Sequence, residues 1–243
     1  MSLFKTLNIF FIIFLLSSKS TAKDIPIIVI APSKSVQSYS SVGTSITLID
    51  REKISKSGKY FLGDVLNSNS VGMNYFRSGG YGTVSGIQLR GLPKRYSTVY
   101  IDGVKMSDPS SSDNSFYLSN IMTSSIDRVE ILRGSNSSIY GSGAIGGVIN
   151  IFTKKGTKKE KSINLSLGSN GTKNLDFFIE DYYNNHSYHL GINKFDTNGI
   201  SAMNDEKSAN DDDSYKNEGL IGNYSYLFSE NFLSDLGRTI THG

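Results

Sequence analysis

The first apolar stretch of the chain is a short uncharged run close to the N-terminus. Residues 7–16 read LNIFFIIFLL, Lys5 lies before them, and a segment of small residues ends at Ala22. A helix that spans a membrane needs about 20 apolar residues, and this run is half as long. A positive start, a short apolar run and small residues before a cleavage point are typical of a secretory signal peptide. The pattern therefore predicts a signal peptide over residues 1–22 and export of the mature chain.

A second apolar run lies between two prolines. Residues 27–31 read IIVIA, with Pro26 before them and Pro32 after them. Because proline has no N–H group and is disfavoured inside a sheet, the pattern predicts an extended segment that is poorly suited to an internal strand. Such a segment is either an ordinary edge strand or a strand that adds to the sheet of another protein. The residues alone favour the edge strand.

Short apolar segments separated by turn residues follow this run. Alternation of apolar and polar residues predicts strands over residues 43–49, 71–76, 86–90, 97–101, 126–132 and 146–152. Asp50 and Gly58 are typical signals for the start and the end of a short helix, and a second short helix is expected over residues 61–66. We therefore expect a small α+β domain, with a mixed sheet and short helices, over residues 41–155.

A lysine-rich segment, interpreted as a solvated linker, precedes a strictly alternating region. Apolar residues alternate with polar ones in segments over residues 163–167, 175–179, 188–192 and 220–228. This alternation predicts antiparallel strands with one apolar face, as in a transmembrane barrel or in an ordinary soluble sheet. The tail over residues 233–243 loses the alternation.

Composition and motifs argue against an enzyme. The chain has no Cys, which excludes disulfides, thiolate zinc sites and cysteine nucleophiles, and its net charge of +3 is too small to indicate a nucleic-acid partner. Gly141, Gly143 and Gly146 fit the spacing G-x-G-x-x-G, but a predicted strand follows them where a dinucleotide site requires a helix. These glycines are therefore assigned to turns and close packing. His186 and His189 are expected on opposite faces of a strand, where they do not share a metal.

Two ordered motifs resemble a known family. Residues 126–134 read IDRVEILRG and residues 138–154 read SIYGSGAIGGVINIFTK, which closely resembles the plug-domain signature of TonB-dependent receptors. LRG at residues 89–91, followed by VYIDGV at residues 99–104, resembles a second signature of that family. The resemblance extends over residues 24–230 and is greatest to the cobalamin receptors. It implies an outer-membrane receptor in which an α+β plug domain is folded inside a β-barrel of about 22 strands.

The resemblance also implies roles for individual residues. For the segment over residues 23–40, it favours a strand that adds to the sheet of another protein. This segment would contain a TonB box, which pairs with the energy-coupling protein TonB. The TonB box comprises Ile27, Ile28, Val29, Ile30 and Ala31. The substrate-facing loops carry Arg77, Tyr81, Ser110, Asp113 and Asn114. A structural charge cluster, expected to pair with barrel carboxylates, comprises Arg90, Glu130 and Arg133. Asp211 and Asp213 match a calcium-binding loop of the cobalamin receptors, although EF-hand spacing is absent.

The region after the plug-like motifs is short for a barrel. Residues 156–243 provide about four to six strands, whereas the smallest outer-membrane barrels have eight. An open sheet edge in lipid leaves main-chain groups unpaired, at a cost of several kcal/mol each. We therefore expect an incomplete transmembrane barrel over residues 156–243, in a fragment, a frameshifted product or part of a split gene.

The expected function is that of an outer-membrane receptor for the uptake of a scarce large nutrient. Its expected partners are TonB, a small-molecule substrate and outer-membrane lipid. The substrate is open between cobalamin, a ferric siderophore and another metal chelate. The alternative is a free periplasmic plug-type module that binds a ligand or TonB without transport. Neither a nucleic acid nor a cofactor is expected, apart from calcium at the acidic run.

Overall fold

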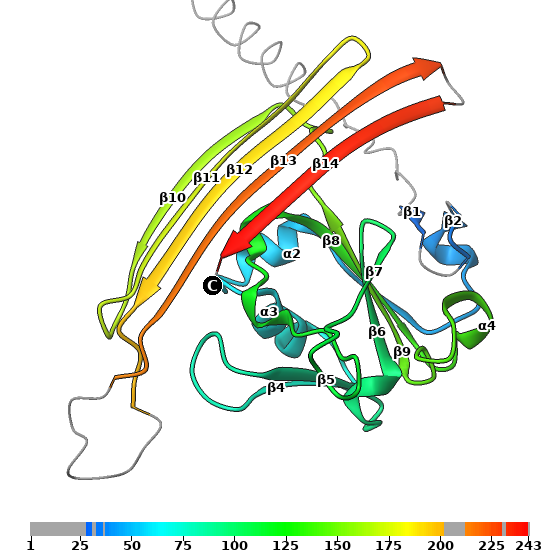
Figure 1. The fold of residues 1–243 in the computed structure, drawn as a ribbon. Helices are drawn as coiled ribbons and strands as arrows, with labels where there is room; N and C mark the ends of the chain where they lie inside the picture. The colour runs from blue at the N-terminus through cyan, green and yellow to red at the C-terminus, as the bar shows by residue number, and fades with distance from the viewer. Residues whose placement is uncertain (1–27, 31–32, 36, 202–211, 230–231, 243) are drawn as a thin grey trace, which may run out of the picture.

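The computed structural model describes residues 28–30, 33–35, 37–201, 212–229 and 232–242 (Figure 1). The signal peptide predicted over residues 1–22 lies outside this set. The chain forms two parts, an N-terminal domain over residues 37–153 and a curved strand wall over residues 160–242, and the two parts lie against each other (Figure 1). Within the described ranges, no helix has both the length and the apolar character needed to cross a membrane.

The N-terminal domain is built on a mixed five-stranded sheet with the strand order β3-β8-β9-β6-β7. β6 and β9 are parallel, and the other neighbouring strands are antiparallel. The sheet strands are β3 (Ile46–Ile49), β6 (Ser97–Ile101), β7 (Val104–Met106), β8 (Ile126–Arg133) and β9 (Gly147–Thr153). A separate hairpin joins β4 (Met73–Arg77) to β5 (Ser85–Leu89). The α+β domain with a mixed sheet is therefore confirmed.

Short helices and turns complete this domain. The α-helices are α2 (Arg51–Lys56), α3 (Leu62–Asn69) and α4 (Ser137–Tyr140), and the 3-10 turns are η1 (Tyr39–Ser41), η2 (Lys94–Tyr96), η3 (Leu118–Asn120) and η4 (Thr123–Ser125). Asp50 begins α2 as predicted, because its Oδ1 accepts a hydrogen bond from Lys53 N at 2.9 Å. β1 (Ile28–Val29), which precedes the domain, pairs with β2 (Gln37–Ser38).

Apolar side chains from the two longer helices and one face of the sheet form the main core. Leu62, Val65 and Leu66 of α3 pack with buried residues such as Val129 on β8 and Ile149 on β9. The helix face that carries these residues is set by their spacing of three and four positions. The core therefore fixes α2 and α3 on the sheet, on the side from which they reach the strand wall (Figure 1).

The strand wall consists of five antiparallel strands paired in sequence order. They are β10 (Glu160–Leu167), β11 (Lys173–Tyr183), β12 (His186–Thr197), β13 (Tyr215–Ser229) and β14 (Phe232–His242). The tail over residues 233–243 lacks the alternation, and residues 233–242 nevertheless belong to β14. Its main chain pairs with β13 from Glu218 to Ser229, so the ladder of the neighbouring strand compensates for the missing alternation.

The two faces of the strand wall have opposite polarity. Buried residues on the face toward the N-terminal domain include Glu180, His189 and Asn193. Exposed residues on the other face include Leu165, Leu190, Ile192, Leu220 and Ile163. A soluble sheet buries its apolar face, whereas a transmembrane barrel turns it outward toward lipid. The polarity therefore decides between the two interpretations of the alternation, in favour of strands of an outer-membrane barrel.

The strand wall has two different ends (Figure 1). The short turn between β11 and β12 lies at the end near β1 and β2. The β4–β5 hairpin points toward the other end, where β12 ends and β13 begins (Figure 1). The N-terminal segment and the β4–β5 hairpin therefore face opposite ends of the strand wall.

Candidate functional site

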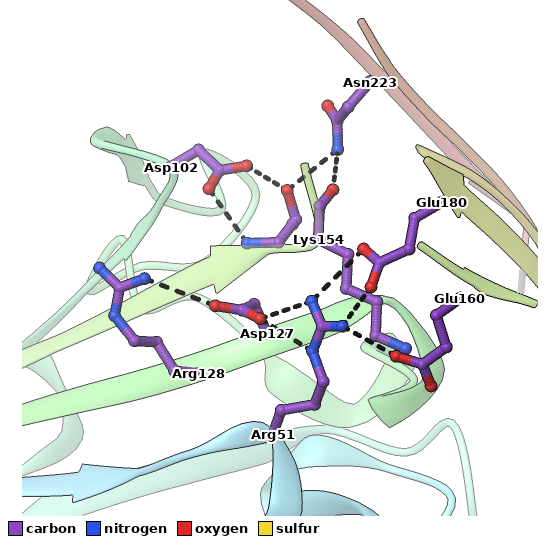
Figure 2. Close-up of polar contacts among 9 residues, drawn as sticks. Arg51, Asp102, Asp127, Arg128, Lys154, Glu160, Glu180 and Asn223 are labelled. Atoms are coloured by element: carbon purple, nitrogen blue, oxygen red, sulfur yellow. Dashed lines mark hydrogen bonds and ion pairs between the residues drawn. The ribbon is translucent and has the colours of Figure 1, made fainter. Parts of the chain in front are cut away.

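An ionic contact between the N-terminal domain and the strand wall is centred on Arg51, the first residue of α2 (Figure 2). Its guanidinium binds Asp127 on β8, with Nε 2.9 Å and Nη2 2.6 Å from Oδ1. The same group forms ion pairs with Glu160 on β10, at 3.2 Å, and with Glu180 on β11. Arg51 therefore joins one carboxylate of its own domain to two carboxylates of the strand wall.

Glu180 is the most buried carboxylate of this contact, because its side chain has no exposed area. A buried charge is costly unless a partner of opposite charge and hydrogen bonds compensate for it. Burial acts to lower the pKa of Arg51, but the hydrogen bond to Glu180 and the charge of Asp127 outweigh it, so the pKa is raised. Arg51 therefore stays charged at physiological pH.

Lys154 directly follows β9 and lies beside the same contact (Figure 2). Only 5% of the residue is exposed, and its Nζ lies 3.4 Å from the ring centroid of Phe178 on β11. Burial, together with the charge of Arg51, lowers the pKa of Lys154 to about 8. The prediction of a solvated linker is therefore wrong for Lys154, because its ammonium group packs against an aromatic ring of the strand wall.

Hydrogen bonds fix the end of β9 to both parts of the chain (Figure 2). Thr153 donates from N and Oγ1 to the Asp102 carboxylate, at 3.0 Å and 2.5 Å. Asn223 on β13 donates from Nδ2 to Thr153 Oγ1 at 3.2 Å and to the Lys154 carbonyl at 2.7 Å. The chain is therefore anchored at the point where it leaves the N-terminal domain for the strand wall.

A cluster of aromatic rings forms a second contact between the two parts. Its members are Tyr60, Phe61 and Tyr81 of the N-terminal domain and Phe195 and Tyr215 of the strand wall. The ring centroid of Tyr81 lies 5.1 Å from those of Phe61 and Phe195 and 6.3 Å from that of Tyr215. The structure packs the ring of Tyr81 in the interface, and the substrate-facing role that the resemblance implies for this residue stays a prediction.

The loop of the β4–β5 hairpin is held close to this aromatic cluster. Arg77 forms an ion pair with Asp64 at 3.3 Å, and its guanidinium lies 4.7 Å from the ring centroid of Tyr81. Gly82 has φ +77°, and a Cβ atom there would lie 2.3 Å from the Tyr215 ring. Glycine is therefore required for the close approach of this loop to the strand wall.

The loop over residues 107–115, which carries the expected substrate-facing residues Ser110, Asp113 and Asn114, is fixed by its own side chains. Ser110 donates from N and Oγ to Asp108 Oδ1, at 2.9 Å and 2.6 Å. Ser111 donates to Asp113 at 2.5 Å, and this hydrogen bond is the main cause of a pKa of Asp113 lowered to about 2. Asn114 adopts φ +53°, a conformation in which Asn is enriched. Asp113 and Asn114 line a cavity of about 360 Å³, so a charged carboxylate borders this space.

The described part of the expected TonB box lies against the N-terminal domain. Ile27 and Ala31 fall outside the described residues. Val29 belongs to β1 and has no exposed area. Ile30 N donates to Oε2 of Glu130 on β8 at 2.8 Å. This segment is therefore bound to the domain by a side chain and by a main-chain group.

Arg90, Glu130 and Arg133 do not form one charge cluster within the described residues. Glu130 accepts a hydrogen bond from Arg128 Nε at 2.9 Å. Arg133 lies three residues farther along the same strand, on the other face, and donates to the Val71 carbonyl at 2.8 Å. Neither Arg90 nor Arg133 contacts a carboxylate in the described part of the chain. The expected pairing of these three residues with barrel carboxylates stays a prediction, and within the described residues α2 supplies a charged contact with the strand wall.

The calcium prediction rests on two aspartates. Asp211 lies outside the described residues, and Asp213 lies exposed just before β13. Among the residues that the structure describes, no three His, Cys, Asp or Glu side chains come together as a metal site would require. Calcium at Asp211 and Asp213 therefore stays a prediction.

The sequence analysis missed the contact between Arg51 and Glu180, although two signals point to it. An arginine at the first position of a helix is opposed by the helix dipole, which favours acidic residues there. Glu180 shares a strand face with Phe178, which is also buried. A positive charge at a helix start and a negative charge on a buried strand face are both unfavourable alone. Each of these residues therefore indicates a partner of opposite charge.

Comparison with known proteins agrees with this arrangement. Residues 38–148 match the family model described as TonB-dependent Receptor Plug Domain. Residues 38–148 form a TonB-dependent receptor plug domain. The resemblance inferred from residues 126–154 is therefore confirmed, and the N-terminal domain is the plug.

A curated relative and solved structures extend the likeness beyond the plug. The chain is 28% identical over 207 residues to the Vitamin B12 transporter BtuB of Vibrio vulnificus (strain CMCP6), which corresponds to 84% of this chain and 33% of the relative. It therefore spans about a third of the length of that relative. FpvA of Pseudomonas aeruginosa, solved with bound pyoverdines, has a TM-score of 0.71 at 17% identity, over 92% of this chain and 28% of FpvA. FauA, the alcaligin outer-membrane receptor of Bordetella pertussis, has a TM-score of 0.69 at 18% identity, over 88% of this chain and 35% of FauA.

These matches bear on the expectations from the sequence. The structural likenesses show the same fold, a plug followed by strands of an outer-membrane barrel. TonB-dependent receptors are outer-membrane proteins, which confirms the expected location. The matched proteins are receptors and a transporter, in agreement with the expectation that the chain is not an enzyme. The match to BtuB supports the expected likeness to the cobalamin receptors.

Proposed function

We propose that this chain serves the TonB-dependent uptake of cobalamin across the outer membrane. The observation that supports this substrate is the 28% identity with the Vitamin B12 transporter BtuB. That match extends over 207 residues, whereas the plug match covers residues 38–148, so the likeness includes the strand wall. The apolar outer face of the strand wall would then contact lipid.

TonB is the proposed energy-coupling partner, and residues 27–31 are its proposed site. Strand addition requires an extended segment whose main-chain groups can pair with a neighbouring strand. Ile28 and Val29 form β1 and are already extended, which favours this mode of binding. β1 also lies at the end of the strand wall opposite to the β4–β5 hairpin (Figure 1), as expected if the partner and the substrate approach from opposite sides.

The proposed substrate contacts come from the two loops of the plug. Asp113 and Asn114 border the cavity of about 360 Å³, and the hydroxyl of Ser110 lies in the same loop. Arg77 lies at the start of the β4–β5 loop. Polar groups on a fixed loop suit the recognition of a large polar molecule, because little conformational entropy is lost on binding.

Binding measurements on the full chain in detergent test the substrate. We expect cyanocobalamin to bind, and Asp113→Ala to weaken that binding more than Asp181→Ala, which changes a carboxylate at the far end of β11. Ferric enterobactin is the competing probe. Binding of ferric enterobactin without cyanocobalamin would replace cobalamin by a siderophore, and binding of neither would contradict the assignment of these loops.

Fractionation and a TonB binding assay test the other parts of the proposal. We expect the chain in the outer-membrane fraction and binding to the purified periplasmic domain of TonB. Val29→Pro is expected to abolish that binding, because proline removes a main-chain N–H group. Recovery of the chain as a soluble periplasmic species would favour the alternative, a free plug-type module without transport.

A further inference from the structure

A lysine lies on the apolar outer face of the strand wall. Ser162 and Ser166 of β10 line a cavity that is shared with residues of α2, so their side chains face the plug. Because side chains alternate along a strand, Lys161 lies on the opposite face, as does the exposed Ile163. On the neighbouring strand β11, Ile179 lies directly opposite Lys161. An exposed cation therefore lies beside apolar side chains of the outer face.

Further positive charge lies at the same end of the strand wall. Lys158 and Lys159 are exposed and directly precede β10. Lys159 Nζ lies 3.5 Å from Asp181 Oδ1 on β11 and 5.1 Å from the ring centroid of Tyr182. Among the described residues, Lys158 and Lys161 form no ion pair. The nearby carboxylate thus neutralises one of three neighbouring lysines.

Aromatic side chains surround these lysines. Exposed rings at this end of the outer face belong to Tyr183, Tyr188, Tyr224 and Phe228. Tyr183 lies beside the short turn between β11 and β12, opposite His186, whose Nδ1 lies 2.6 Å from the hydroxyl of Tyr224. Tyrosine is enriched where the apolar interior of a membrane meets the polar headgroups. The rings therefore place the lysines at the level of the headgroups.

Lysines at the other end of the outer face have partners. Lys194 on β12 pairs with Glu218 on β13, and Lys216 on β13 pairs with Asp196 on β12. Each of these two lysines is neutralised by a carboxylate of the neighbouring strand. An excess of positive charge therefore distinguishes the short-turn end, and it is complementary to an anionic headgroup.

We propose that Lys161, together with Lys158 and Lys159, forms a site for the headgroup of an anionic phospholipid. The aliphatic part of a lysine can lie along an apolar surface while its ammonium group reaches the polar boundary. Each lysine near a membrane surface strengthens binding to anionic lipid about fivefold. The nearby tyrosine hydroxyls can donate hydrogen bonds to phosphate oxygens. The proposal rests on the proposed function only for the assignment of this end to the periplasmic side.

Native mass spectrometry of the full chain in dodecyl maltoside micelles tests this site. Dioleoyl phosphatidylglycerol and dioleoyl phosphatidylcholine are added in equal amounts, so that the competing lipids differ only in the headgroup. We expect the parent to retain phosphatidylglycerol in about tenfold excess. Lys161→Gln is expected to lower this preference about fivefold, whereas Lys161→Arg keeps the charge and is expected to keep the preference. Neither substrate nor TonB is present, so the outcome is independent of both.

Lys194→Gln is the matched control, because it removes an exposed lysine at the other end of the same face. We expect this variant to keep the preference for phosphatidylglycerol. Equal losses in Lys161→Gln and Lys194→Gln would show that only net charge matters and would overturn the proposal. The absence of a preference in the parent would overturn it as well. Displacement of phosphatidylglycerol by inorganic phosphate would contradict a lipid site and assign the lysines to a free anion.

Discussion

Arg51 and Glu180 form an ion pair between residues that lie 129 positions apart in the chain. The pair connects the start of α2 in the plug with β11 in the strand wall. Asp127 and Glu160 share the same guanidinium, so its positive charge faces three carboxylates. A single side chain thereby couples the position of the plug to that of the strand wall.

Removal of the guanidinium is expected to weaken this coupling strongly. Arg51→Met leaves the buried carboxylate of Glu180 without its main partner, and such a loss costs about 3 kcal/mol or more in the free energy of unfolding. Urea unfolding followed by circular dichroism measures the loss. Lys56→Met is the matched control, because it breaks an ion pair with Glu52 in the same helix that is exposed on both sides. The control is expected to change stability far less, because an exposed ion pair contributes little, and equal losses in both variants would contradict the assigned role of Arg51.

Lys154 is expected to make the stability of the chain depend on pH. Burial lowers its pKa to about 8 from 10.5, so the unfolded state holds the proton more tightly than the folded state. Between these two values the unfolded state binds more protons, and stability therefore rises with pH. The full effect is about 3 kcal/mol, most of it above pH 8. At pH 7 the amine is charged in both states, and the cost of burying this charge is present in full.

Comparison with Lys154→Met isolates this contribution. The variant has no titrating amine, so we expect it to be more stable than the parent at pH 7 and to lose most of that advantage by pH 9.5. The measurement is the difference in urea unfolding free energy between the two proteins at each pH, which cancels the ionisation of the tyrosines. A difference that stays constant from pH 7 to pH 9.5 would show that Lys154 is not desolvated.

The parts of the structure that could be predicted depend on local sequence. Asp50 caps α2, and the strand over residues 126–132 follows from its own apolar pattern, so neither requires a distant partner. The Arg51–Glu180 contact could not be predicted in this way, because it depends on how the plug is seated against β11. The strand β14 was missed for a similar reason, since its pairing is provided by β13 and its own residues do not alternate.

For the expected site residues, the sequence predicted the element on which a residue lies better than the residues that it contacts. Asp113 and Asn114 lie in the expected loop beside a cavity. Glu130 was expected among charges of a barrel, whereas its observed partners are Arg128 and the main chain of Ile30. A strand pattern assigns a residue to one face of a sheet, but it does not identify the segment that covers that face.

Gly156 is expected to be essential for the path of the chain from the plug to the strand wall. It has φ +72°, and a Cβ atom there would lie 2.3 Å from the backbone oxygen of Tyr188 on β12. Gly103 provides the matched control, because its φ is +85° and no atom lies within 4 Å of a Cβ placed there. Gly156→Ala is expected to cost about 3 kcal/mol or more, against about 1 kcal/mol for Gly103→Ala. Similar losses of urea stability in the two variants would show that β12 can move away from Gly156.

Tyr81 allows a packing role to be separated from a role in substrate binding. Its ring contacts Phe61, Phe195 and Tyr215, and the guanidinium of Arg77 lies over it. Tyr81→Ala removes these contacts and is expected to cost about 2 kcal/mol in the free energy of unfolding. Tyr81→Phe keeps the ring, so its stability is expected to stay within about 0.5 kcal/mol of the parent. If packing is the main role, Tyr81→Phe also binds cyanocobalamin as the parent does. A variant that is fully stable but binds cyanocobalamin less tightly would instead assign the Tyr81 hydroxyl to the substrate.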